Sequence, residues 1–307
     1  MKLKTFAAAL AATTIAGSAI AADLPSRKVA PIVAAAPVPT WTGFYIGINA
    51  GGAFGGSGGI STLGTPTFAN PAFLAGGGAV AGALANANTN SFGAGASSGF
   101  MLGGQVGVNY QMGSLVAGLE ADIAGVFGSK KSASGAVFTT LGPFGFPAEN
   151  YAGVVSASRK LDYFGTLRAR LGFVVTPPLL LYVTGGLAYA GVSANYFSGL
   201  QESLGPATYA PVGTNGSLSE TRFGWTIGAG GEWKFSPNWS LKAEYLYYDV
   251  GTASFTSGSN QINLVAPGTP IWGSSANKTS ARFNGHVARA GLNYHFNWNA
   301  APVVARY

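Results

Sequence analysis

The side chains that could do chemistry in this sequence are charged residues at alternate positions of short segments. Glu120 and Asp122 stand two apart in one segment, and Arg168 and Arg170 do so in another. Paired carboxylates can carry out general acid–base catalysis. Here the acids are spread over several segments and matched by bases, which favours structural ion pairs. The predicted network contains Glu120, Asp122, Asp162, Arg168, Arg170, Arg222, Glu232, Lys234, Lys242, Glu244 and Arg289.

The segments that carry these charges alternate between apolar and polar residues. This period of two is typical of a β-strand with two unlike faces. In the last segment, one face is apolar and ends in Tyr294 and Phe296, whereas the other carries Arg289 and Asn293. Eight strands are predicted, over residues 44–50, 100–110, 115–127, 161–173, 179–189, 222–235, 239–249 and 286–296.

The connections between these strands alternate in length. Three are short, around Met112, Pro177 and Pro237, and four are long, over residues 51–99, 128–160, 191–221 and 251–285. Membrane β-barrels have short periplasmic turns and long external loops. We therefore predict an all-β fold, an eight-stranded antiparallel transmembrane β-barrel with four long external loops and three short periplasmic turns. Apolar faces would meet lipid, and charged faces would fill the lumen.

The composition favours a membrane barrel over a globular enzyme or a disordered chain. The 307 residues include 12 % aromatic and only 9 % charged residues, against about 25 % charged residues in globular proteins. Disordered chains are poor in aromatic residues. The sequence has no cysteine, which excludes disulfides and thiol chemistry. We predict no catalytic site and no cofactor.

Metal and nucleic-acid sites are not predicted either. The two histidines, His286 and His295, fall on opposite faces of one predicted strand and so cannot share a metal. The net charge is +7, yet Lys130 and Lys131 form the only basic cluster. Nucleic-acid binding needs a broader basic surface.

The first residues have the pattern of an export signal. Lys2 and Lys4 precede a short apolar run, and the stretch that ends at Ala21 has the small residues of a cleavage site. We predict a signal peptide over residues 1–21, a proline-rich periplasmic lead-in over 22–40, the barrel over 41–298 and a tail over 299–307. The expected location is the outer membrane.

Aromatic residues gather near the ends of the predicted strands. Interfacial girdles of membrane barrels have this distribution, whereas an ordinary aromatic core would place them at mid-strand. The predicted girdle contains Trp41, Phe44, Tyr110, Phe173, Trp233, Trp239 and Tyr247.

Both ends of the predicted barrel resemble a known family. The stretch from Trp41 to Gly47, with the upstream start at Ala22 to Pro25, resembles the small outer-membrane β-barrel proteins of alphaproteobacteria. These are also called outer-membrane immunogenic or porin-family proteins, and are related to the barrel of outer-membrane protein A. The closing strand is similar to the signal that the family's assembly machinery reads, with matches at Arg289, Gly291, Tyr294 and Phe296.

The resemblance implies a non-enzymatic envelope protein with a structural, surface-presenting role and narrow pore activity for small solutes. The alternatives are a porin-type diffusion channel, or binding of a ligand or host surface through the loops, haem included. A lumen filled with ion pairs argues against a large conductance. The implied partners are outer-membrane lipids and lipopolysaccharide, the barrel-assembly machinery and periplasmic chaperones.

Overall fold

The computed structural model describes residues 40–54, 56, 59–69, 74–92, 98–141, 149–204, 207–208, 212–263 and 271–296. The predicted signal peptide, the lead-in up to residue 39 and the tail lie outside these residues. Within the described part, no helix combines the length and the apolar character needed to cross a bilayer.

Eight strands of one antiparallel sheet close into a ring, as predicted. In ring order they are β1 (Gly43–Phe54), β4 (Gly99–Met112), β5 (Leu115–Phe127), β7 (Glu149–Thr176), β8 (Leu179–Leu204), β10 (Val212–Lys234), β11 (Trp239–Asn263) and β12 (Ile271–Phe296). The ring closes because β1 pairs with both β4 and β12. A closed ring leaves no edge with unpaired backbone groups, which is the condition for crossing lipid with strands.

The three short turns occur at the predicted places. Gly113 and Ser114 join β4 to β5, Pro177 and Pro178 join β7 to β8, and residues 235–238 join β10 to β11. Gly113 has a φ of 61°, a left-handed conformation that favours glycine because no Cβ clashes there.

Over much of the ring, large apolar side chains point outward. Ile48, Leu119 and Ile227 are 63 %, 56 % and 58 % exposed. Their neighbours along each strand point inward and are polar, so this part has the inside-out pattern of a membrane barrel. We call it the membrane section, and its outer limit on β7 and β8 is marked by Tyr163 and Tyr189.

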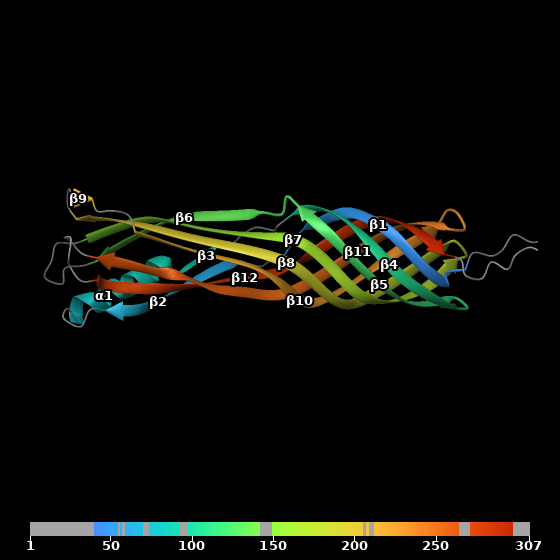
Figure 1. Ribbon diagram of the computed structural model, residues 1–307, viewed down its shortest axis with the longest axis horizontal. Helices are drawn as coiled ribbons and strands as arrows, with labels where there is room; N and C mark the ends of the chain where they lie inside the picture. Colours follow the sequence, from blue (N-terminus) through green and yellow to red (C-terminus); the bar gives the residue numbers. More distant parts are fainter. Residues whose placement is uncertain are drawn as a thin grey trace, which may run out of the picture. The chain divides into compact units, whose positions relative to one another are not determined.

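Beyond that limit, the predicted long loops are largely strand. β7, β8, β10, β11 and β12 continue well past their predicted ends, and Figure 1 shows them as long ribbons reaching the end that carries α1. β6 (Lys131–Leu141) pairs with β7, β2 (Ile60–Ala69) pairs with β12, β3 (Asn90–Phe92) pairs with β2, and β9 (Ala207–Thr208) pairs with β8. The unpredicted helix α1 (Leu74–Asn88) contacts β2, β6 and β12.

This outer extension comprises the described residues within 60–92, 131–160, 191–221 and 252–283. On β7 and β8 its side chains are arranged in the opposite way to those of the membrane section. Val155, Val192 and Tyr196 point inward and are buried, whereas Ser158 and Asn195 point outward. The alternation of small residues there was not recognised as strand because its outward face is polar.

Candidate functional site

Eight charged side chains converge inside the membrane section. They come from β5, β7, β10, β11 and β12, and none is more than 5 % exposed. We call them the lumen ion cluster: Glu120, Asp122, Arg168, Arg170, Glu232, Lys242, Glu244 and Arg289. Four carboxylates face four cationic groups, so the formal charges cancel.

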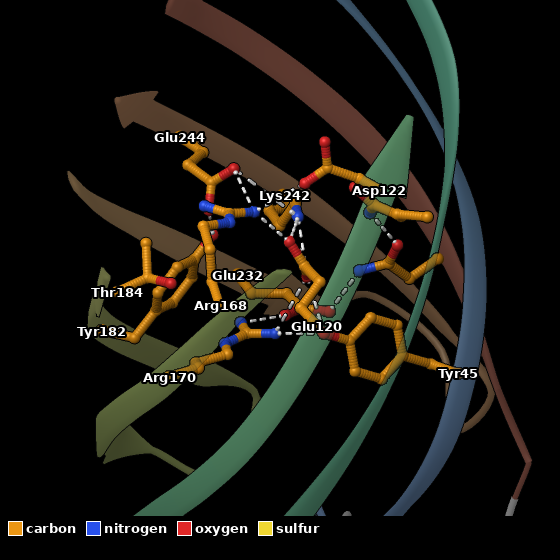
Figure 2. A network of polar contacts seen from close by, with 12 residues as sticks. Tyr45, Glu120, Asp122, Arg168, Arg170, Tyr182, Thr184, Glu232, Lys242 and Glu244 are labelled. Atoms are coloured by element: carbon orange, nitrogen blue, oxygen red, sulfur yellow. Dashed lines mark hydrogen bonds and ion pairs between the residues drawn. The ribbon is translucent and has the colours of Figure 1, made fainter. Parts of the chain in front are cut away.

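Arg168 lies at the centre of the cluster. Its guanidinium donates to Glu120, to Asp122 Oδ2 at 3.1 Å and to Glu244 Oε1 at 2.8 Å. Strand register explains the first contact, because Glu120 of β5 lies directly opposite Arg168 of β7. Figure 2 shows Arg168 between Glu120 and Glu244. A buried guanidinium with three carboxylate partners is well compensated for its lost hydration.

Arg289 and Lys242 complete the upper part of the cluster. Arg289 donates to Asp122 Oδ2 at 2.8 Å and to Glu244 Oε2 at 2.9 Å. Lys242 Nζ lies 2.8 Å and 2.9 Å from the two carboxylate oxygens of Glu120. Glu244 and Arg289 are direct cross-strand partners between β11 and β12. Every one of these five groups therefore has an opposite charge beside it.

The lower part of the cluster is centred on Arg170. Its guanidinium donates to Glu232 and stacks 3.8 Å from the centre of the Tyr182 ring. The Tyr45 hydroxyl donates to Glu120 Oε2 at 2.6 Å and accepts from Arg170 at 3.1 Å. Tyr45 thus links the two parts of the cluster, as Figure 2 shows.

Uncharged polar side chains fill the space around the charges. The Asn293 carboxamide donates through Nδ2 to Glu232 Oε1 at 2.8 Å and accepts through Oδ1 from Gln105 Nε2. The Ser240 hydroxyl donates to the same Glu232 oxygen at 2.5 Å, and His295 Nε2 lies 3.1 Å from it. Sequence reasoning left Tyr45, Tyr182, Gln105 and Asn293 out of the network, although their inward position in the strand alternation would have identified them.

Apolar layers lie on both sides of the ion cluster. On the outer side, Phe164, Leu246 and Val287 are completely buried and belong to the apolar interior that continues into the outer extension. On the periplasmic side, Trp41 packs with Val116, Leu180 and Tyr182. An apolar cluster therefore lies on each side of the ion cluster, and on the periplasmic side Lys234 and His295 pack against it.

Three predicted members of the network lie elsewhere. Asp162 is on the outer surface, 2.6 Å from Lys160 Nζ, because a β-bulge between Leu161 and Tyr163 shifts the alternation. The same bulge turns Leu161, predicted to face lipid, into the interior.

Arg222 and Lys234 also lie away from the cluster. Arg222 pairs with Glu220 at 3.3 Å, near the outer extension. Lys234 sits at the periplasmic end, where its Nζ donates to the Thr40 carbonyl at 2.5 Å and lies 4.7 Å from the Trp41 ring centre. Both residues occupy inward positions of β10, as predicted. They lie above and below the ion cluster, however, and the alternation alone does not say how far along the barrel a residue lies.

Most predicted girdle residues point outward. Phe44, Tyr110, Phe173, Trp233 and Trp239 are exposed, and Tyr247 is half-buried on the same face as Tyr245. The prediction is wrong for Trp41, which is only 1 % exposed. It precedes β1 and turns into the barrel end, where its ring meets that of His295 edge-on at 5.8 Å.

The predicted assembly-signal residues divide between the two faces of β12. Arg289 and Gly291 face the lumen, whereas Tyr294 and Phe296 face outward. The Tyr294 ring lies 5.2 Å from Trp239 and 5.1 Å from Phe296. His286 and His295 lie on opposite faces of this strand, and among the residues that the structure describes there is no cluster of three metal-ligating side chains.

Comparison with known proteins gives consistent matches. A family model described as the outer membrane protein beta-barrel domain matches residues 56–296. The 31 kDa outer-membrane immunogenic protein of Brucella melitensis biotype 1 is 33 % identical over 300 residues, which cover 96 % of this chain and 100 % of that protein. The 22 kDa outer membrane protein of Rhizobium leguminosarum bv. viciae is 29 % identical over 171 residues, covering 53 % of this chain and 62 % of the relative. The solved structure of OprG from Pseudomonas aeruginosa is 12 % identical, with a TM-score of 0.38, and the match covers 85 % of this chain and 100 % of that one.

Proposed function

We propose that this chain, which belongs to the outer membrane protein β-barrel domain family, is a closed barrel with a structural and surface-presenting role. Its place is the outer membrane, which the matching family and relatives share. The membrane section would anchor the chain, and the outer extension would be the part displayed to the surroundings. The single observation that carries this proposal is the lumen ion cluster with an apolar layer on each side.

The filled lumen favours a closed barrel rather than an open pore. A hydrated solute would have to separate buried ion pairs such as Arg168 with Glu244, 2.8 Å apart. It would also have to cross the layers around Phe164 and Trp41, which are 0 % and 1 % exposed. Leaving a buried charge unpaired costs about 3–5 kcal/mol. We therefore favour a barrel without steady conductance over both a narrow pore and a porin-type channel.

A non-enzymatic role is part of the same proposal. Every carboxylate of the lumen ion cluster has a guanidinium or ammonium partner within 4.0 Å. Such pairing occupies the acids, whereas a general acid or base must be within reach of a substrate proton. The buried carboxylates thus serve better as cross-links between strands than as catalytic groups.

Planar-bilayer recording of the purified, refolded chain tests the proposal. We expect no stable conductance steps in bilayers where a diffusion porin gives them. Heat-modifiable gel migration would establish separately that the sample is a folded barrel. Stable steps in the nanosiemens range from a folded sample would contradict the closed lumen.

A further inference from the structure

A polar groove crosses four neighbouring strands on the outward face of the outer extension. Its volume is about 760 Å³, and its lining comes from β6, β7, β8 and β10 together with Lys130, which precedes β6. These strands are consecutive in the sheet, and Figure 1 shows β6 at the upper edge of the ribbons. We call this feature the outer groove.

Strand register arranges the lining side chains in two rows. In the first row Ser132 lies opposite Ser158, Ser158 opposite Asn195, and Asn195 opposite Ser217. Direct cross-strand neighbours have Cβ atoms about 5 Å apart. The row is therefore a regular ladder of hydroxyl and carboxamide groups that runs across the strands.

The second row adds an aromatic ring to the same face. Ser156 lies opposite Phe197, and Phe197 lies opposite Asn215. The Phe197 ring is 49 % exposed, and it is the one large apolar side chain exposed among the described residues that line the groove. Along each strand the two rows are two residues apart, about 7 Å.

From this arrangement we propose that the outer groove binds an uncharged oligosaccharide. Serine hydroxyls and asparagine carboxamides both donate and accept hydrogen bonds, as sugar hydroxyls do. Among the described residues, no other protein group hydrogen-bonds to the side chains of Asn195, Asn215 or Ser217, so these groups face solvent. The exposed ring of Phe197 offers a flat apolar face to the C–H groups of a pyranose, while its neighbours in both rows bind the hydroxyls.

The lining excludes other classes of ligand. No carboxylate is among the described lining residues, which argues against a cation, and Lys130 is the sole charged group among them, which is too little for a polyanion. Phe197 is the one exposed apolar side chain there, which is too small a surface for a lipid chain. A protein partner would need about 800 Å² of complementary surface, whereas this site is a concave groove of ligand size.

The height of the groove fits a sugar chain at the cell surface. Ser156 and Ser158 lie five to seven residues beyond Tyr163, which marks the outer limit of the membrane section on β7. At about 3.3 Å per residue this is roughly 15–25 Å. That distance places the groove above the lipid headgroups, where the saccharide of an outer-leaflet glycolipid or a free glycan can reach it.

Titration of the full chain in detergent micelles tests the proposal. One probe is the oligosaccharide released by mild acid from the glycolipid of the source membrane, then dephosphorylated, and the other is maltoheptaose. Binding is followed by saturation-transfer NMR and calorimetry. We expect at least one probe to bind, and binding of the first probe alone would identify the membrane's own glycolipid as the source.

Matched substitutions locate the binding. Phe197→Ala should weaken affinity about tenfold and Asn215→Ala about fivefold. Phe138→Ala is the control, because Phe138 is 79 % exposed on β6 and does not line the groove. Its affinity should match that of the unaltered chain. Gel migration of each unheated variant confirms folding.

Three outcomes would overturn the proposal. The first is that neither probe binds the folded chain at millimolar concentration. The second is binding that both Phe197→Ala and Asn215→Ala leave unchanged, in which case the face is open to a protein partner instead. The third is binding only of a sulfated oligosaccharide that Lys130→Ala abolishes, which would make the groove an anion site.

Discussion

The membrane section and the outer extension are built from the same strands but have opposite interiors. In the lower part of β8, Val183 points outward and Thr184 points into the lumen. In the upper part of the same strand, Val192 and Tyr196 point inward and Asn195 points outward. The pleat is continuous, so the direction of each side chain is set in the same way throughout. What changes is whether apolar or polar side chains occupy the outward positions.

The surroundings of the strands account for this inversion. In the membrane section, lipid offers no hydrogen bonds, so charges are buried inside and pair with each other. In the extension, water covers the outward face, and on β7 and β8 apolar residues gather inside, as in a soluble β-structure. The pattern inverts at Tyr163 on β7 and Tyr189 on β8, and we therefore expect the lipid to end at this height.

The largest expected effect comes from removing the central cation of the membrane section. Arg168→Ala leaves Glu120, Asp122 and Glu244 without their shared partner, so we expect the free energy of unfolding to fall by about 3–5 kcal/mol. Lys160→Ala breaks an exposed pair in the extension and should cost less than about 1 kcal/mol. Urea unfolding in micelles, followed by gel migration, measures both. Equal losses would break the distinction between the two regions.

The second-largest expected effect comes from an arginine on the outward face of β8, which should destabilise the membrane section more than the outer extension. Val183→Arg puts a charge against lipid and is expected to cost about 2–4 kcal/mol. Ser193→Arg, on the same face above the boundary, removes the half-buried hydrogen bond of the Ser193 hydroxyl to Asp162 at 2.6 Å and should cost about 1 kcal/mol or less. Refolding yield in lipid vesicles and urea unfolding are the measurements. If Val183→Arg inserted and unfolded like the unaltered chain, that face of β8 would not meet lipid.

The closing strand provides an intermediate test, on assembly rather than stability. Phe296→Ala removes an outward aromatic at the periplasmic end of β12, so we expect a lower yield of folded protein in the outer membrane. Phe138→Ala, an equally conservative change in the extension, should leave the yield unchanged. An undiminished yield for Phe296→Ala would refute the role of this residue in insertion.

The smallest expected effect is a contribution of Tyr196, in the extension, to the pH dependence of stability. Burial raises the pKa of Tyr196 to about 12, above the value of about 10 in an unfolded chain. Its contribution to stability is therefore complete below pH 10 and is lost as the pH rises through 12. For Tyr196→Phe, the free energy of unfolding should therefore fall less steeply between pH 10 and pH 12 than it does for the unaltered chain. Identical alkaline profiles would contradict a buried, neutral Tyr196.

The sequence predicts the membrane section well because lipid imposes a strong rule on it. Large apolar residues such as Ile48 and Leu119 alternate with polar ones, so both the ring and most lumen charges follow from a period of two. The outer extension lacks this contrast, since its outward serines and inward alanines and valines alternate only weakly. The sequence therefore predicts loops where the structure has strands, and it does not predict α1.

Local irregularities explain the remaining misplaced residues. The bulge at Leu161 and Tyr163 moves Asp162 from the lumen to the surface. No residue type at that position predicts a bulge. Trp41 was placed in the girdle because aromatics favour interfaces. Its actual position depends on the ring of His295 and the ammonium of Lys234, which are distant in the sequence.

Single-cysteine labelling along β8 tests the central claim most directly, because the chain has no cysteine of its own. Cysteines are introduced at Val183, Thr184 and Ser193, one at a time, and the folded protein is embedded in vesicles. We predict that a membrane-impermeant maleimide labels the site at 193 alone, that a lipid-soluble maleimide labels the site at 183, and that the site at 184 reacts with neither. Rapid labelling at 184 by the impermeant reagent would show a water-filled lumen and contradict the closed barrel.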